Sequence, residues 1–221
     1  LGAQYRQDRY QQTTGSGREL MAEQPDAGTQ RYAQEQVNLG AEHYRQGRFA
    51  EAAAAWGAVP ESVPDQYAVA QVDLGIMYGS TGDAAQAIAA WQKVPQSEIQ
   101  AYAVAQYNIG SVYEGQEKDE AALAAYGNIP EADTMHYAMG QFNSAVLLHM
   151  HGNFRAALGV YQNVPESVPD QYARAQLNLG VLYQQMGLDD KARESWNRVP
   201  ADYPDLYEVA QSYLNDEDED S

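Results

Sequence analysis

The sequence predicts an all-α protein, a right-handed α-α superhelix built from helical pairs, and two observations support this prediction. First, a tyrosine returns every 35 residues, and a fixed period of this size is typical of stacked supersecondary units. Second, other residue types recur in step with it. We count positions within each repeat from this leading tyrosine, which is found at Tyr32, Tyr67, Tyr102, Tyr137, Tyr172 and Tyr207.

Four further positions define the repeat. Position eight is small in every copy: Gly40, Gly75, Gly110, Ala145 and Gly180. Position twenty is always alanine: Ala52, Ala87, Ala122, Ala157 and Ala192. Position twenty-four holds what we call the second-helix aromatic: Trp56, Trp91, Tyr126, Tyr161 and Trp196. A proline follows four residues later: Pro60, Pro95, Pro130, Pro165 and Pro200. We expect the small residues to let two helices approach closely around the large ring.

Each unit is therefore predicted as helix, glycine turn, helix and proline loop. The first helix should run from the tyrosine for about fourteen residues and the second for about eleven, stopping at the proline, which cannot continue a helix. Five repeats result: 32–66, 67–101, 102–136, 137–171 and 172–206. We expect residues 1–31 to be a degenerate repeat, and residues 207–221 to be a half-repeat cap with an acidic tail.

The amino-acid composition limits the classes of partner that the chain is expected to bind. The net charge is −18, and residues 32–200 carry nine Lys and Arg against nineteen Asp and Glu. Such a surface repels phosphate backbones, so no nucleic-acid partner is expected. No apolar stretch is long enough to span a membrane, and there is no cysteine. The compartment stays unknown: the chain is expected to be soluble, in the cytoplasm or in the periplasm or outside the cell. Because the sequence begins at Leu1 and not at Met, we expect either that a leader has been removed or that the chain is cut from a longer array.

These positions resemble the tetratricopeptide repeat, in which Leu-Gly-x-x-Tyr is followed by Ala-x-x-x-Phe and then Pro. Leu74, Gly75, Tyr78, Ala87 and Trp91 fill those places in one copy. The chain departs from the pattern in three ways: glutamine replaces the first-helix tryptophan, the period is 35 residues, and an extra proline closes the second helix. The sequence of residues 105–110, AQYNIG, also resembles Sel1-like repeats. Both families imply an α-solenoid that binds proteins or peptides.

One side of the first helices, at positions two, five and nine, is almost wholly apolar, and we call it the groove face. Its residues are Gln34, Val37, Ala41, Val69, Val72, Ile76, Val104, Tyr107, Ser111, Met139, Phe142, Val146, Arg174, Leu177 and Val181. The resemblance implies that this side lines a concave groove that docks an extended peptide or an amphipathic helix, with Tyr107 and Phe142 as anchors. Alternatively, neighbouring first helices bury much of it.

Position six runs beside the groove face and is polar throughout. It holds Asn38, Asp73, Asn108, Asn143 and Asn178. Amides that recur at the spacing of packed helices match about three residues of extended chain, so they can bond a ligand backbone. Equally, they can tie helix to helix. Only Arg174 lies near the groove as a cation, which disfavours recognition of a C-terminal carboxylate. At position four a glutamine recurs on the inward side, and we expect Gln–backbone or Gln–Gln bonds there.

Nothing in the chain predicts catalysis, a cofactor or a metal. His149 and His151 are two residues apart and point to different sides of a helix end, which is unlike a metal site, and no catalytic motif occurs. The sequence therefore predicts a non-catalytic scaffold that binds proteins or peptides through the groove face. The alternative is a structural subunit of a larger complex, or a segment that associates with itself.

Overall fold

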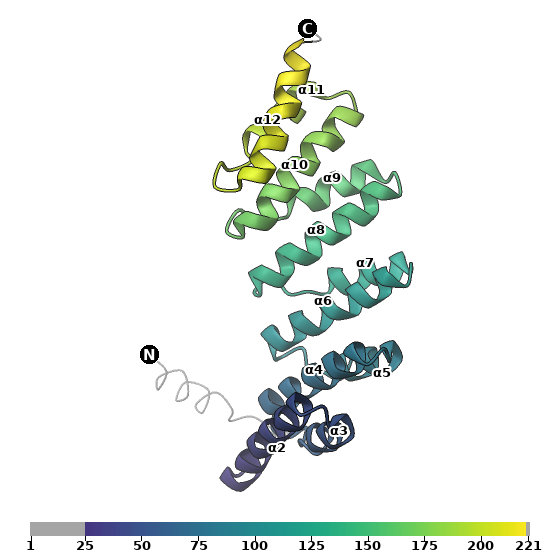
Figure 1. Ribbon diagram of the computed structural model, residues 1–221, viewed down its shortest axis with the longest axis vertical. Coiled ribbons are helices and arrows are strands. Elements are labelled where there is room, and N and C mark those ends of the chain that lie inside the picture. The colour runs from purple at the N-terminus through teal and green to yellow at the C-terminus, as the bar shows by residue number, and fades with distance from the viewer. Residues whose placement is uncertain (1–24, 220–221) are drawn as a thin grey trace, which may run out of the picture.

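A computed structural model describes residues 25–219, and within that range every regular element is an α-helix (Figure 1). The first helices of the pairs are α2 (Ala27–Arg45), α4 (Pro64–Ser80), α6 (Ile99–Gly115), α8 (Thr134–Met150), α10 (Pro169–Gln185) and α12 (Pro204–Glu219). The second helices are α3 (Phe49–Gly57), α5 (Ala84–Trp91), α7 (Asp119–Gly127), α9 (Phe154–Gln162) and α11 (Asp189–Asn197). The all-α prediction is confirmed. Most of the predicted degenerate repeat, residues 1–24, lies outside the described part.

The helix ends differ from the predicted ones. The four first helices from α4 to α10 have 17 residues each and begin three residues before the leading tyrosine. Pro64 and Pro169 occupy the first turn of α4 and α10, where a missing backbone N–H costs nothing. In α8, Asp133 accepts from the backbone N–H of His136 and caps the same turn. The second helices are shorter than predicted, with eight or nine residues.

The turn between the two helices of a pair needs a left-handed backbone. Four of the five turns place a glycine there, at Gly47, Gly82, Gly152 and Gly187, each with a positive φ. In the third repeat the same position is Glu117, with φ of 57°. A residue with a Cβ is sterically disfavoured in that region. The third turn nevertheless keeps the left-handed conformation although it lacks the glycine that adopts it most easily.

The second-helix aromatic packs against the small residue at position eight, as predicted. A Cβ added to Gly75 would lie 2.2 Å from Nε1 of Trp91, and one added to Gly180 would lie 2.0 Å from Nε1 of Trp196. The same contact recurs between Gly110 and Tyr126, where the added Cβ would lie 2.4 Å from the ring. Only glycine leaves room for rings this close. The aromatic residues are almost completely buried in consequence.

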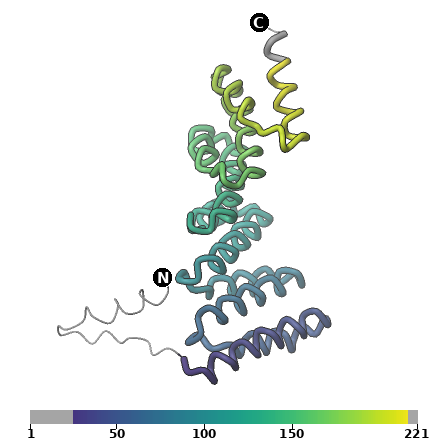
Figure 2. Tube along the Cα trace, turned by 90° about the vertical axis from the view of Figure 1, so that its left-hand side faces the viewer, coloured from purple at the N-terminus to yellow at the C-terminus, as the bar shows by residue number. Residues whose placement is uncertain are grey.

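The first helices form one continuous layer. Each first helix contacts the next one along the array, and each second helix contacts the following first helix. Among the described residues, successive second helices do not contact one another. The pairs stack one above another from α2 to α12 (Figures 1 and 2).

The prediction for the glutamines at position four is wrong. Gln71 and Gln176 are buried, and their side-chain Oε1 atoms have no hydrogen-bond partner. Gln141, which is only half-buried, accepts from Asn163 Nδ2 at 3.4 Å, which is a side-chain contact within its own repeat. The apolar environment between pairs therefore offers these amides neither backbone nor a second glutamine.

Candidate binding groove

The groove face remains accessible along the array. Val69 and Ile76 of α4 are 42% and 43% exposed, which is unusual for aliphatic side chains in the middle of a helix. Gln34, Ser111 and Arg174 are also exposed, and only Val37 is buried. The remaining residues are half-buried: Ala41, Val72, Val104, Tyr107, Met139, Phe142, Val146, Leu177 and Val181. Neighbouring helices thus cover this side only in part, and an apolar strip is left open.

Tyr107 and Phe142, the predicted anchors, are partly committed to the core. The ring of Tyr107 lies 5.8 Å from that of Tyr126, and the ring of Phe142 lies 6.1 Å from that of Tyr161. Each therefore shows one side to the groove and packs its other side on a second-helix aromatic. Cutting either to alanine would leave a cavity as well as remove a contact.

The polar residue at position six lies against the second-helix aromatic of the preceding repeat, seventeen residues earlier. Asn143 Nδ2 donates to the Tyr126 hydroxyl at 3.2 Å, and Asn178 Nδ2 donates to the Tyr161 hydroxyl at 3.2 Å. In α12 the same position is Tyr213, whose ring stacks on Trp196 at 5.0 Å. Asn143 and Asn178 therefore tie one repeat to the next, which is the structural alternative for these two amides.

Trp56 and Trp91 make no such hydrogen bond to the following repeat within the described residues. The indole Nε1 of Trp56 donates to the carbonyl of Val37 at 3.2 Å, and that of Trp91 donates to the carbonyl of Val72 at 3.2 Å. Both bonds stay within one repeat. Position six of the following repeat is then left without a hydroxyl partner: within the described residues, neither Asp73 nor Asn108 makes a side-chain hydrogen bond or an ion pair.

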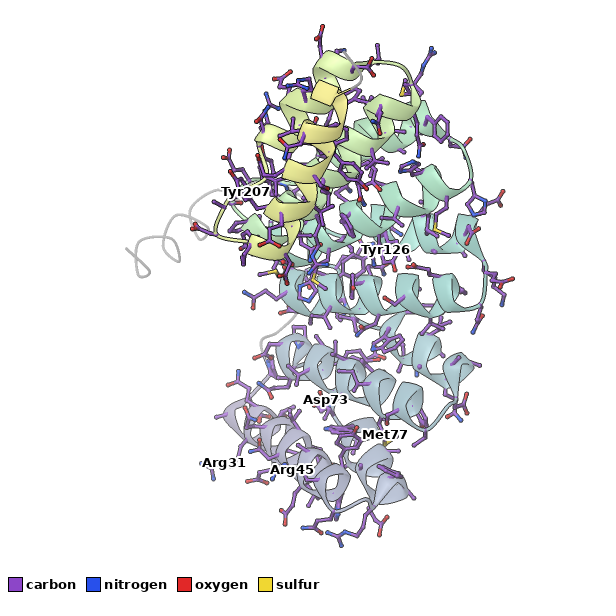
Figure 3. All side chains as sticks on the ribbon, turned by 45° about the horizontal axis from the view of Figure 1, so that its top comes forward. Arg31, Arg45, Asp73, Met77, Tyr126 and Tyr207 are labelled. Carbon is purple, nitrogen blue, oxygen red and sulfur yellow. The ribbon has the colours of Figure 1, made fainter. Side chains whose placement is uncertain are left out.

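Asp73 is the one acidic residue at position six. It lies on α4 one turn before the buried Met77 (Figure 3). The side chain is half-buried, and desolvation raises the pKa of its carboxyl group above the ordinary value, with no neighbouring charge contributing. A half-buried carboxylate without a donor is unfavourable by itself, so Asp73 differs from Asn143 and Asn178 in having unused bonding capacity.

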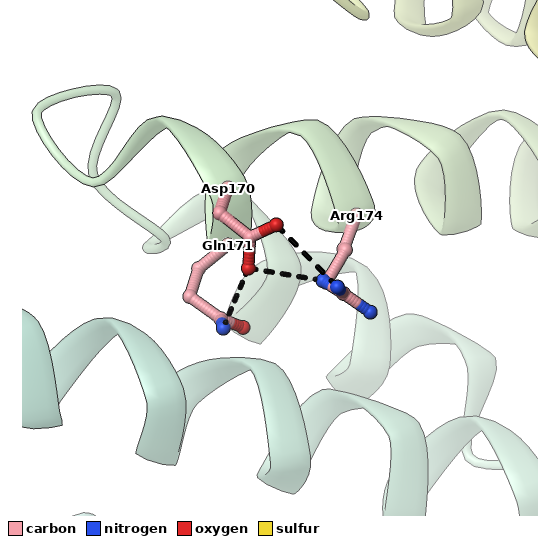
Figure 4. Close-up of polar contacts among 3 residues, drawn as sticks. All are labelled: Asp170, Gln171 and Arg174. Atoms are coloured by element: carbon pink, nitrogen blue, oxygen red, sulfur yellow. Dashed lines mark hydrogen bonds and ion pairs between the residues drawn. The ribbon is translucent and has the colours of Figure 1, made fainter. Parts of the chain in front are cut away.

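Arg174, the one cation on the groove face, is already paired. Its Nε lies 3.1 Å from Oδ2 of Asp170, and its Nη2 lies 3.4 Å from Oδ1 of the same carboxylate, one turn earlier on α10 (Figure 4). Gln171 Nε2 donates to the same Oδ2 at 3.3 Å. The positive charge at this end of the groove is therefore compensated from within the chain.

The hydroxyl group of Tyr126, on α7, makes hydrogen bonds to side chains of both α6 and α8. The Tyr126 hydroxyl donates to Glu114 Oε2 at 2.6 Å while it accepts from Asn143, and Ser111 Oγ lies 3.4 Å away. Burial and the Glu114 bond raise the pKa of Tyr126 far above its ordinary value. Burial likewise raises the pKa of Tyr161 to about 12. Both phenols are neutral bonding groups at physiological pH.

Comparison with known proteins agrees with this architecture. Residues 174–205 match the tetratricopeptide repeat family model. The crystal structure of MamA protein is similar, with a TM-score of 0.55 at 21% identity over 77% of this chain and 91% of that one. A second MamA crystal structure gives 0.53 at 20% identity, over 82% and 97% of the two chains. A tetratricopeptide repeat protein from Parabacteroides merdae gives 0.56 at 18% identity, over 81% and 71%. A search of curated proteins gives no match.

The chain therefore has the helical-pair fold of tetratricopeptide repeat proteins, and residues 174–205 match the repeat itself. The predicted resemblance to tetratricopeptide repeats is confirmed by the match of residues 174–205 and by the fold of the similar solved structures. The likeness to Sel1-like repeats remains a resemblance of sequence. Within the described residues no helix is long and apolar enough to cross a membrane, and no group of three or more His, Asp or Glu is placed to hold a metal ion.

Sequence reasoning missed a hollow of about 350 Å³ where α8, α9 and α10 meet. Its walls are Val146, His149 and Met150 of α8, Phe154 and Tyr161 of α9, and Asn178 and Gln185 of α10. His149 lies edge-on to Phe154 and Tyr161 and forms a 2.9 Å hydrogen bond with Gln185. The available signal was Ala145, because among the five repeats this one alone has a residue other than glycine at position eight.

Proposed function

We propose that this chain is a non-catalytic scaffold that binds a protein or peptide segment along the groove face of its first helices. The tetratricopeptide fold supports an interaction scaffold in general. The observation that carries the more specific proposal is the open apolar strip: Val69, Ile76 and their neighbours stay accessible although they stand in the middle of packed helices. Contiguous exposed apolar surface of this kind marks binding sites.

Unused polar groups beside the strip support the same proposal. Asp73 and Asn108 are half-buried and have no partner within the described residues. An extended segment presents backbone N–H and C=O groups that such side chains can bond, while its apolar side chains cover the strip. The hollow between α8 and α10 would then receive one larger apolar side chain.

The test is a selection from a phage-displayed library of random twelve-residue peptides against the full chain. The wild-type protein should yield binders, and replacing Val69 and Ile76 together by serine should weaken them by about tenfold or more, because two apolar contacts are lost. The matched control is Ile99→Ser: Ile99 is 44% exposed at the start of α6 and lies outside the groove positions. Binders that respond equally to both variants, or an absence of binders, would refute the groove.

A second candidate function is self-association, which one observation favours. Tyr32 and Leu39 of α2 are 46% and 40% exposed, whereas their equivalents Tyr67 and Leu74 are buried against the preceding pair. This face of α2 thus fits another helical pair, and we assign it to a second copy of this chain. Light scattering should show a dimer whose mass falls to the monomer value in Tyr32→Ser with Leu39→Ser. A wild-type mass that stays monomeric at all concentrations would exclude it.

A further inference from the structure

We infer that Asp73 is a receptor for a cationic side chain, so that the segment bound in the groove carries a lysine or arginine opposite α4. This inference rests on the proposed function and makes the partner more specific: an extended, largely apolar segment with a basic residue. Nothing in the tetratricopeptide pattern requires an acid at this position, because four of the five repeats have asparagine there.

The location of Asp73 follows from the repeat. Three equivalent residues lie against the aromatic seventeen residues earlier: Asn143 on Tyr126, Asn178 on Tyr161 and Tyr213 on Trp196. The same offset places Asp73 at Trp56, between α2 and α4. Trp56 cannot satisfy it, because the only hydrogen of the indole nitrogen is donated to the Val37 carbonyl. The acid therefore occurs where the protein itself supplies no donor.

The surroundings of Asp73 favour a cation over a neutral ligand group. The exposed aliphatic side chains of Val69 and Ile76 stand about one turn to either side of it on α4. A carboxylate in such an apolar setting binds an ammonium or guanidinium group more strongly than it would in water, because the pair is less screened. An asparagine would bond a ligand backbone equally well without the cost of burying a charge. The negative charge of Asp73, and not its ability to accept a hydrogen bond, is therefore the feature that points to a cationic ligand group.

Charge complementarity along the array points the same way. The cation of the groove face, Arg174, is held by Asp170, so none of the described groove-face positions offers an unpaired positive charge to Asp73 or to an acidic segment. The chain as a whole carries a net charge of −18. An acidic array with one uncompensated carboxylate in its groove attracts basic segments over distance and then positions one basic side chain.

The experiment uses the peptides selected from the random library on the wild-type chain. We expect lysine or arginine to be enriched at one position of those peptides. Changing that residue to glutamine in a selected peptide should lower its affinity for the wild-type chain by about tenfold or more, since a charge-assisted bond is lost. For Asp73→Asn the same peptide change should alter affinity by less than about threefold. Asp65→Asn removes an equal charge from the exposed first turn of α4 and serves as the matched control.

The outcomes separate this inference from the proposed function. Selected peptides that lack a basic position, or whose lysine matters equally to the wild-type chain and to Asp73→Asn, would overturn the role of Asp73 and leave the groove intact. If the selected peptides lack a basic position but bind the Asp73→Asn variant more weakly than the wild-type chain, Asp73 accepts from a backbone N–H of the peptide instead. Binders that ignore Val69→Ser with Ile76→Ser would refute the groove itself, and the inference with it.

Discussion

Asp73 and Asn178 occupy the same position in two repeats, yet the structure treats them differently. Asn178 donates to the hydroxyl of Tyr161 and links α10 to α9. Asp73 follows a tryptophan, has no donor within the described residues and faces the groove with its bonding capacity unused. Tyr126 and Tyr161 thus hold the position-six amides of the following repeats, whereas Trp56 and Trp91 leave Asp73 and Asn108 without a hydrogen-bond partner among the described residues.

The difference comes from how far each ring reaches. An indole fills the space beside the glycine and donates to a carbonyl of its own repeat, three residues before that glycine. A phenol carries its hydroxyl at the tip, so it bonds across to the following repeat. One substitution on a buried second helix thus decides whether a polar group on the accessible first helix is structural or free.

The largest expected effect comes from a substitution that disrupts the packing of the Trp91 indole beside Gly75. Gly75→Ala would place a Cβ 2.2 Å from Nε1 of Trp91, which pushes the indole away and breaks its bond to the Val72 carbonyl. We expect a loss of about 2–4 kcal/mol in the free energy of unfolding, measured by urea denaturation.

Gly79→Ala is the control for this change on the same helix. Its Cβ would make ordinary contacts, the nearest being 3.7 Å from the Trp91 ring, so the better helix propensity of alanine should leave stability unchanged or about 0.5 kcal/mol higher. Equal losses in the two variants would show that the close approach of indole and helix does not determine stability.

The tyrosine arrangement is broken by Tyr126→Phe. Its hydroxyl donates to the Glu114 carboxylate and accepts from Asn143, so its removal leaves two half-buried groups unpaired. We expect a loss of about 1–2 kcal/mol, measured by denaturant unfolding. Tyr161→Phe, which loses the Asn178 bond, should cost less, about 1 kcal/mol. The reverse order would mean that the Glu114 bond contributes nothing.

The smallest expected effect is the change in the free energy of unfolding caused by Asp73→Asn at position six. Because desolvation raises the pKa of folded Asp73 above its unfolded value, the ionised group destabilises the fold at neutral pH, and this penalty disappears as pH falls through the folded pKa. Asp73→Asn should therefore be more stable than wild type at pH 7 by about 0.5 kcal/mol, a small value because the carboxylate is still partly solvated.

Thermal unfolding across pH checks this sign. The advantage of Asp73→Asn should shrink as the pH is lowered into the ordinary aspartate range, since wild-type Asp73 then becomes neutral as well. An advantage that is constant with pH, or a variant that is less stable than wild type at pH 7, would show that Asp73 is not desolvated. A stabilising change that weakens cation binding would mark Asp73 as a residue whose use is in binding.

Much of the fold follows from the sequence, because equal spacing in the chain becomes equal spacing in space. The pairing of Gly75 with Trp91 and the common side of Val69, Val72 and Ile76 are consequences of helix geometry. The first helices begin three residues before the tyrosine at which the sequence predicts their start, because a proline such as Pro64 also suits the first turn of a helix.

The polar contacts were not predictable in the same way. Which atom the Trp56 indole or the Tyr126 hydroxyl bonds depends on the distance and rotation between successive pairs, and a repeat period does not contain that information. For the same reason the bonds expected for Gln71 and Gln176 are absent. The boundaries at residues 32–206 and the site residues as ligand contacts remain predictions.

The most direct test of the account is where a bound segment touches the array. A photoreactive amino acid at the exposed Val69 of α4, or at the exposed Ala89 of α5 on the second-helix layer, should be irradiated with a peptide selected on the wild-type chain. We predict a covalent adduct from position 69 and none above background from position 89. Equal adducts from both, or an adduct from position 89 alone, would contradict a groove on the first helices.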